Sequence, residues 1–320
     1  MMFMLKLNNF NQDQNQFKIT KFLKLSLVFL AIMVINLVLV YQLVYLPNQV
    51  ANNLNSNVQT YNQIVENLNT IPVKTEVRLS GESTSSGKLA EQITTAKEVQ
   101  SANQEFLEQA QEATKLLDNG PTTENQELTS LIQQSLNKKI EITEYNSLVK
   151  KNQICIAEEL LKFVTNLEKV VENLRSVSSL RDETKVIENL NDSADRLEKG
   201  AIALKTIKNC FDADLINYYT QDVENDVDAD VELYETFTNL LKQLAEAVSN
   251  QDDSQIEAKT TEILNLNTQK SRIIENNSLQ NVIESILEEA ILKNQEVTIY
   301  QDKINNRAEQ IKQKYNISEV

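Results

Sequence analysis

Two cysteines are the residues of this sequence whose type and spacing most directly suggest chemistry. They are Cys155 and Cys210, and the chain contains no others. The surrounding sequence predicts a helical hairpin, with helices over residues 153–178 and 182–210 that turn near residue 180. Cys155 lies 25 residues before that turn and Cys210 lies 30 residues after it, so both thiols are expected near the same end of the hairpin.

This register leaves three interpretations of the cysteine pair open. A disulfide would tie the open end of the hairpin and stabilise the fold by about 2–4 kcal/mol. Against it, packed helices lie about 8–10 Å apart whereas bridged Cα atoms lie within about 6.8 Å, and Gly200 could end the second helix early. In order of preference, the interpretations are a disulfide, two buried free thiols and a redox-active pair.

An acidic stretch over residues 222–235 is the second candidate for chemistry. A calcium loop needs oxygen ligands at alternating positions, a sharp turn at the sixth position and Glu at the twelfth. Counting from Glu224, Glu235 is the twelfth residue, but the sixth is Ala229 rather than Gly. Apolar residues also recur at helical spacing, namely Val223, Val227, Val231 and Tyr234. This spacing favours the solvated acidic face of a helix over a cation site.

The residues that most enzymes use are missing from this chain. It has no His, which removes Ser-His-Asp and Cys-His catalysis, His-ligated zinc and the common general base near neutral pH. Its four glycines are too scattered to form a phosphate-binding loop or a dinucleotide fingerprint. We therefore predict a protein that is not an enzyme and that has no cofactor and no metal site.

Residues 25–46 form the stretch around which the rest of the chain is organised. They include no charged residue, and as a helix they would span roughly 33 Å, which is enough for the hydrocarbon core of a bilayer. A cleaved signal peptide is the main alternative, but its apolar region is typically about 7–15 residues long. We predict an uncleaved transmembrane helix that contacts the lipid bilayer.

The charges that flank this span predict its orientation. Lys6, Lys18, Lys21 and Lys24 precede it against a single Asp13, and no basic residue follows it until Lys74. The positive-inside rule therefore places the N-terminus in the cytoplasm and the C-terminal domain outside.

One polar side chain lies in the middle of the span. An amide there can hydrogen-bond to a neighbouring helix, so Asn36 is a candidate contact for self-association within the membrane. The alternative is a polar residue that the helix tolerates without any partner.

The remaining sequence predicts an all-α protein, in which a single N-terminal transmembrane helix is followed by an elongated antiparallel helical bundle. Apolar residues at helical spacing over 154–174 and 274–291 mark its core helices. Ile71–Leu79 alternates like a strand, which suggests pairing with another chain or an extended linker. The expected segments are a disordered cytoplasmic tail (1–24), the transmembrane helix (25–46), a helical stalk (47–70), an extended flexible linker (71–87) and an extracytoplasmic helical-bundle domain (88–320).

The charge of the chain limits its partners. The formal net charge is −15, although the tail before the span is basic, so the acidic excess lies after the span. Such a surface repels nucleic acid. We expect a membrane-anchored scaffold or protein-interaction module that holds an unknown protein or envelope partner, with a homo-oligomer as one form. The alternative is a ligand-binding or sensory module that acts with a separate membrane protein and has a partly polar pocket between its helices.

Overall fold

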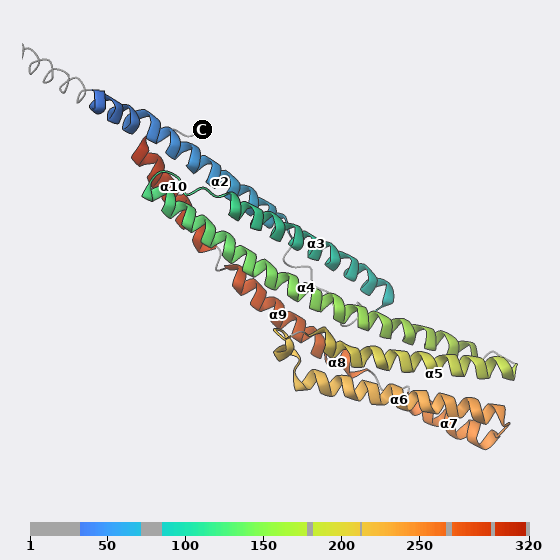
Figure 1. Cartoon of the computed structure of the whole chain (residues 1–320). Helices are drawn as coiled ribbons and strands as arrows, with labels where there is room; N and C mark the ends of the chain where they lie inside the picture. The colour runs from blue at the N-terminus through green and yellow to red at the C-terminus, as the bar shows by residue number, and fades with distance from the viewer. Residues whose placement is uncertain are drawn as a thin grey trace, which may run out of the picture. The chain divides into compact units, whose positions relative to one another are not determined.

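The computed structural model describes residues 33–71, 85–177, 182–211, 213–266, 271–295 and 298–317 of this 320-residue chain. Every regular element in these ranges is a helix, which confirms the all-α prediction (Figure 1). The predicted cytoplasmic tail and most of the predicted linker, residues 72–84, lie outside the described residues.

The elements follow one another with short connections, and several packed helices run antiparallel. They are η1 (Tyr41–Tyr45), α2 (Leu46–Thr70), α3 (Ser86–Leu116), α4 (Thr123–Val177), α5 (Glu183–Thr206), η3 (Ile207–Cys210), η4 (Ile216–Tyr218), α6 (Gln221–Ser249), α7 (Asp253–Leu266), α8 (Arg272–Glu275), α9 (Ser278–Gln295) and α10 (Thr298–Tyr315).

The first described helix contains the part of the apolar stretch that begins at Met33. Met33–Asn69 is the one helix in the described part of the chain that is long and apolar enough to cross a membrane. Its apolar side chains from Met33 to Tyr45 are exposed. Because nothing in the described fold buries them, this helix is suited to insertion into a bilayer.

The helical winding changes just before Pro47. Proline has no N–H to donate to the carbonyl of Leu43, and it disfavours a regular α-helical turn at that point. The chain forms the π-helical turn η1 there, in which the Leu46 N–H donates to the carbonyl of Tyr41, five residues earlier in the chain. The junction between the apolar stretch and α2 is therefore helical throughout.

The chain divides into two compact units, and the first combines segments that are distant in the sequence. It comprises Met1–Asn62, Leu116–Gln134 and Tyr300–Val320. The buried apolar side chains within it come from α2, the start of α4 and α10, namely Val50, Leu54, Tyr61, Leu128, Ile132, Ile304, Ala308 and Ile311. The first half of the predicted stalk thus shares a core with residues that the sequence assigned to the bundle domain.

Buried amides join the segments of the first unit. The Asn57 amide donates to the Asp118 carbonyl at 2.8 Å and to the Thr129 hydroxyl at 2.9 Å. The Asn125 amide donates to the Asn53 side-chain oxygen at 2.9 Å, and Asn53 in turn donates to the Asp118 carbonyl. Because buried polar groups are stable only when paired, this network fixes how α2 meets the start of α4.

The turn between α3 and α4 depends on Gly120. Its φ is +69°, and a Cβ added there would lie 2.5 Å from the Asn53 side-chain oxygen. Thr122 then caps α4 by accepting from the Asn125 N–H at 3.3 Å. The chain therefore has a turn that glycine alone adopts without strain, followed directly by a helix cap.

The second unit comprises Gln63–Lys115 and Ser135–Ile299 and holds the larger core. The two apolar stripes that were expected to be core are largely buried in it, with Ile156, Leu160 and Phe163 from α4 and Ile283, Ile286 and Leu287 from α9. α5 and α6 pack against each other along this unit (Figure 1).

The predicted hairpin of α4 and α5 is present in the second unit. Asp182 caps α5 by accepting from the Thr184 N–H at 3.1 Å. Gly200 does not end α5 but lies within it, and a Cβ added there would lie 3.2 Å from the Phe163 ring. A residue without a side chain at this position therefore allows α5 to approach α4 closely.

Candidate functional site

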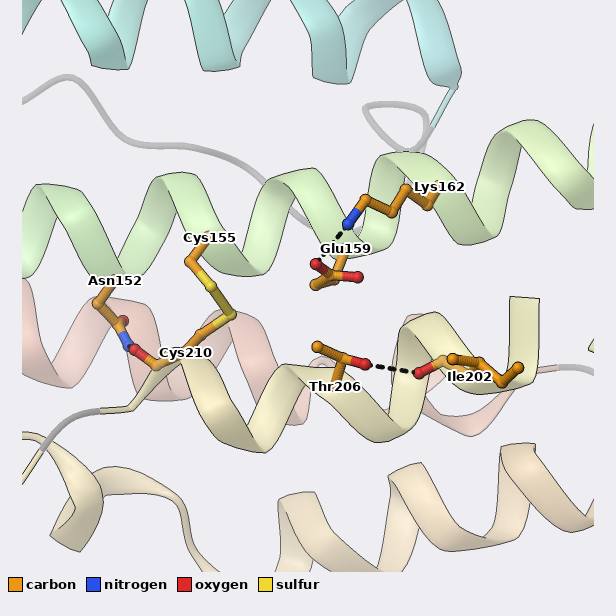
Figure 2. The surroundings of a disulfide bond; sticks show 7 residues. All are labelled: Asn152, Cys155, Glu159, Lys162, Ile202, Thr206 and Cys210. Carbon is orange, nitrogen blue, oxygen red and sulfur yellow. Dashed lines mark hydrogen bonds and ion pairs between the residues drawn. A yellow bond between two sulfur atoms is a disulfide. The ribbon is translucent and has the colours of Figure 1, made fainter. Parts of the chain in front are cut away.

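The structure joins the two cysteines in a disulfide (Figure 2). Cys155 projects from α4, and Cys210 is the last residue of η3, so the bond closes 55 residues of sequence with a Cα–Cα distance of 5.5 Å. The Asn152 amide, one helical turn before Cys155, donates to the Cys210 carbonyl at 3.1 Å. Two contacts thus hold the end of the hairpin.

The position of Cys210 explains how the bond spans two helices. Packed α-helices are generally too far apart for a disulfide between their axes. Cys210 lies beyond the end of α5, in the tighter 3-10 turn η3, where the chain is no longer held at the spacing of two packed α-helices.

The polar side chains near the disulfide form their hydrogen bonds and ion pairs within their own helices. Lys162 pairs with Glu159 at 2.6 Å on α4, and the Thr206 hydroxyl donates to the Ile202 carbonyl at 2.9 Å on α5 (Figure 2). Both cysteines are bonded, so neither supplies a thiolate, which is the nucleophilic form of cysteine. The arrangement serves to lock the hairpin.

The acidic stretch over residues 222–235 lies within α6, and the expectation that its carboxylates form a solvated face is wrong at two positions. Asp226 is 8% exposed and Asp230 is 1% exposed. Asp226 accepts from the Asn276 amide at 2.8 Å. The reason is tertiary: α8 packs on α6 and covers both side chains.

Asp230 caps the short helix α8 from a different element. Its carboxylate accepts from the Ser271 hydroxyl at 2.5 Å, from the Arg272 N–H at 2.7 Å and from the Ile273 N–H at 3.1 Å. Burial raises the pKa of Asp230, and these hydrogen bonds oppose that rise. The carboxylate therefore positions α8, and protein donors occupy it.

A polar hollow of about 580 Å³ lies beside this region, between η4, the first turns of α6 and the α8–α9 segment. Its buried lining residues are Asp226, Ser278 and Val282. The more exposed lining is supplied by hydroxyl, amide and carboxylate side chains, namely Asn217, Tyr218, Thr220, Asp222, Asn225, Asn276, Asn281 and Ser285. Its volume is in the range of small-molecule sites.

A second hollow of about 450 Å³ shares Asn217 and Tyr218 with the first and has a different charge pattern. Tyr218 donates a hydrogen bond to Glu289. Lys293 pairs with Glu289 at 3.1 Å and lies 3.8 Å above the ring centre of Tyr145. Burial, reinforced by the charge of Glu289, raises the pKa of Tyr145 to about 12, so this phenol stays protonated at neutral pH.

Metal-binding geometry does not occur among the residues that the structure describes, where no group of three or more His, Cys, Asp or Glu side chains could hold an ion. The alternating acidic residues from Glu224 to Glu235 follow a continuous helix in α6. A helix spreads such residues around its axis, so they cannot wrap one cation as a calcium loop does.

Asn36 lies in the helical residues 33–40 and is exposed, among the exposed apolar side chains of the span. Its predicted role in self-association stays a prediction. Comparison of the chain with protein-family models, with curated proteins and with solved structures gave no match.

Proposed function

We propose that this protein is a membrane-anchored, extracytoplasmic helical scaffold or protein-interaction module without enzymatic activity. One observation carries the proposal: the helix with the exposed apolar span, residues 33–45, continues into α2, whose Val50, Leu54 and Tyr61 side chains are buried in the core of the first unit. The anchor and the folded unit are therefore one continuous element, as suits a protein that presents a domain at a membrane.

The length of the apolar stretch favours a retained anchor over a cleaved signal peptide, because the apolar region of a signal peptide is typically about 7–15 residues long. The flanking lysines place the N-terminus in the cytoplasm under the positive-inside rule. The disulfide agrees with a domain outside, because disulfides persist mainly in oxidising compartments.

Site-specific crosslinking in intact cells tests the scaffold role. A photo-crosslinking residue is placed at Ile202, Leu264 or Leu292, which are exposed apolar positions of the second unit. The proposal predicts a reproducible adduct with another protein from at least one of these positions, and no adduct from the same variants without irradiation.

The possible outcomes separate the candidate functions. An adduct between two copies of the chain would point to a homo-oligomer, with Asn36 and residues 71–79 as the first contacts to mutate. The absence of any adduct from abundant, folded protein would contradict the scaffold role. It would favour the alternative, a ligand-binding module, which the polar hollow of about 580 Å³ supports.

A further inference from the structure

We propose that the hollow between η4, α6 and the α8–α9 segment binds a small polar molecule that carries an ammonium group. This goes beyond the scaffold role, and it specifies a ligand for the alternative function. The inference rests on an unpaired buried hydroxyl, on the charge of the lining and on the size of the hollow.

The unpaired hydroxyl belongs to Ser278, the first residue of α9. Ser278 is 8% exposed and lines the hollow, and its Oγ has no hydrogen-bond partner among the described residues. A buried polar group without a partner is destabilising, because it has given up its hydrogen bonds to water and gained none in return. Neighbouring atoms cover this hydroxyl, so a ligand reaches it only after the Ser278 side chain rotates to another χ1 rotamer, and the hydrogen bond then formed recovers the lost free energy.

The charge of the lining determines which polar group fits. The charged side chains that line the hollow are Asp222 and Asp226, and no described lining residue is basic. Asp226 accepts one hydrogen bond, from Asn276, and a carboxylate has capacity for about four. An ammonium group donates three hydrogen bonds and has no acceptor, so it complements a carboxylate beside an unpaired hydroxyl.

The neighbouring hollow provides an internal comparison. There the basic Lys293 already pairs with Glu289 and covers the ring of Tyr145. The protein thus supplies its own ammonium group in the second hollow, whereas the described lining of the first supplies none. The acidic lining of the first hollow is therefore the one that an external cation would complement.

An organic cation fits the hollow better than a metal ion. The described residues include no group of three or more carboxylate, His or Cys side chains placed to hold a metal. The volume of about 580 Å³ also exceeds what one ion requires and suits a small organic molecule. The amide and hydroxyl groups of the walls can hydrogen-bond to the polar body of such a molecule.

Isothermal titration calorimetry on the full chain in detergent tests the proposal with matched probes. Glucosamine is compared with glucose, and putrescine with 1,4-butanediol, because each pair differs in its ammonium groups. We expect at least one ammonium probe to bind with a Kd below about 1 mM, and its neutral counterpart to give no saturable heat.

Matched variants locate the binding. Asp226→Asn removes the buried charge and should weaken binding at least about ten-fold, and Ser278→Ala should weaken it about three-fold. Asp228→Asn removes the same charge from an exposed position of α6 that does not line the hollow, and it should leave the Kd unchanged. If Asp226→Asn fails to fold, Asn281→Lys introduces an ammonium group at an exposed lining position and should abolish binding.

Several results would overturn the inference. They are the absence of saturable binding by either ammonium probe up to about 10 mM, equal binding of the neutral probes, and equal weakening by Asp226→Asn and Asp228→Asn. Saturable binding of calcium chloride without binding of the ammonium probes would make the hollow a metal site and would overturn it as well. None of these results bears on the crosslinking test of the scaffold role.

Discussion

Cys155 and Cys210 close 55 residues of the second unit, and in the chain-entropy model such a closure stabilises by restricting the unfolded chain. We expect the double variant Cys155→Ser/Cys210→Ser to lose about 2–4 kcal/mol of unfolding free energy, measured by denaturant unfolding in detergent. Reductant should lower the stability of the wild-type protein and leave the double variant unchanged. Alkylation of two thiols in non-reduced native protein would contradict the disulfide.

Gly120 gives a second residue-scale prediction. In Gly120→Ala the new Cβ would require a left-handed φ of +69° and would lie against the Asn53 side chain, so the unfolding free energy should fall by about 1–3 kcal/mol. Gly87→Ala is the matched control, because a Cβ there meets nothing within 4 Å on helix α3. Equal effects of the two substitutions on the thermal midpoint would contradict this explanation.

The position of a single residue can be predicted from the sequence where it depends only on counting along regular helices. Helical rise alone places Cys155 and Cys210 near one end of a hairpin, because both helices are regular between them. It misplaces Asp226 and Asp230, because their burial depends on α8, which lies more than 40 residues further along the chain. The unpaired Ser278 hydroxyl leaves no sequence signal, since only the fold shows which hydroxyl is buried.

The C-terminal helix closes the first unit through charge as well as packing. Lys314 bonds to Glu124, and Arg307 bonds to Glu127, which joins α10 to the first turns of α4. The hydrogen bond from Lys314 lowers the pKa of Glu124 from its ordinary 4.5 to about 2. Because the folded pKa is depressed, the stability it contributes is present above about pH 4.5 and is lost as the pH falls toward 2.

Glu124→Gln should therefore lower the unfolding free energy near neutral pH, by less than about 1 kcal/mol because the pair is largely solvated. The difference from wild type should disappear as the pH falls to about 2, in denaturant unfolding at each pH. Glu141→Gln is the control, since Glu141 pairs with Lys138 within one helix. A constant difference for Glu124→Gln across this pH range would contradict the linkage.

Helix ends were predictable where their signals are local. Thr122, Asp182 and Asp252 each cap the helix that follows them, and residue types that cap helices can be recognised in a sequence because a cap needs only a side chain and the next turn. The docking of α10 in the first unit was not predictable. Its partners Glu124 and Glu127 lie about 180 residues earlier, and its buried stripe of Ile304, Ala308 and Ile311 does not reveal which helix it contacts.

At the scale of the whole molecule, both ends of the described chain meet in the first unit. α2 and α10 bury side chains there, and the second unit is formed by the two intervening segments Gln63–Lys115 and Ser135–Ile299. Because the helix with the apolar span continues into α2, the proposed membrane anchor belongs to the first unit. The crosslinking positions Ile202, Leu264 and Leu292 all lie in the second unit. The two segments of that unit interrupt the sequence of the first unit, which carries the proposed anchor.

Protease accessibility in sealed membrane vesicles of known orientation tests the central proposal most directly. With the outer face exposed, protease should digest the domain after residue 47 and leave a protected fragment that carries an N-terminal tag and the apolar span. In inverted vesicles the tag should be removed and the domain should be protected until detergent is added. Protection of the domain in outward-facing vesicles, or release of the whole chain as a soluble protein, would contradict a retained anchor with an extracytoplasmic domain.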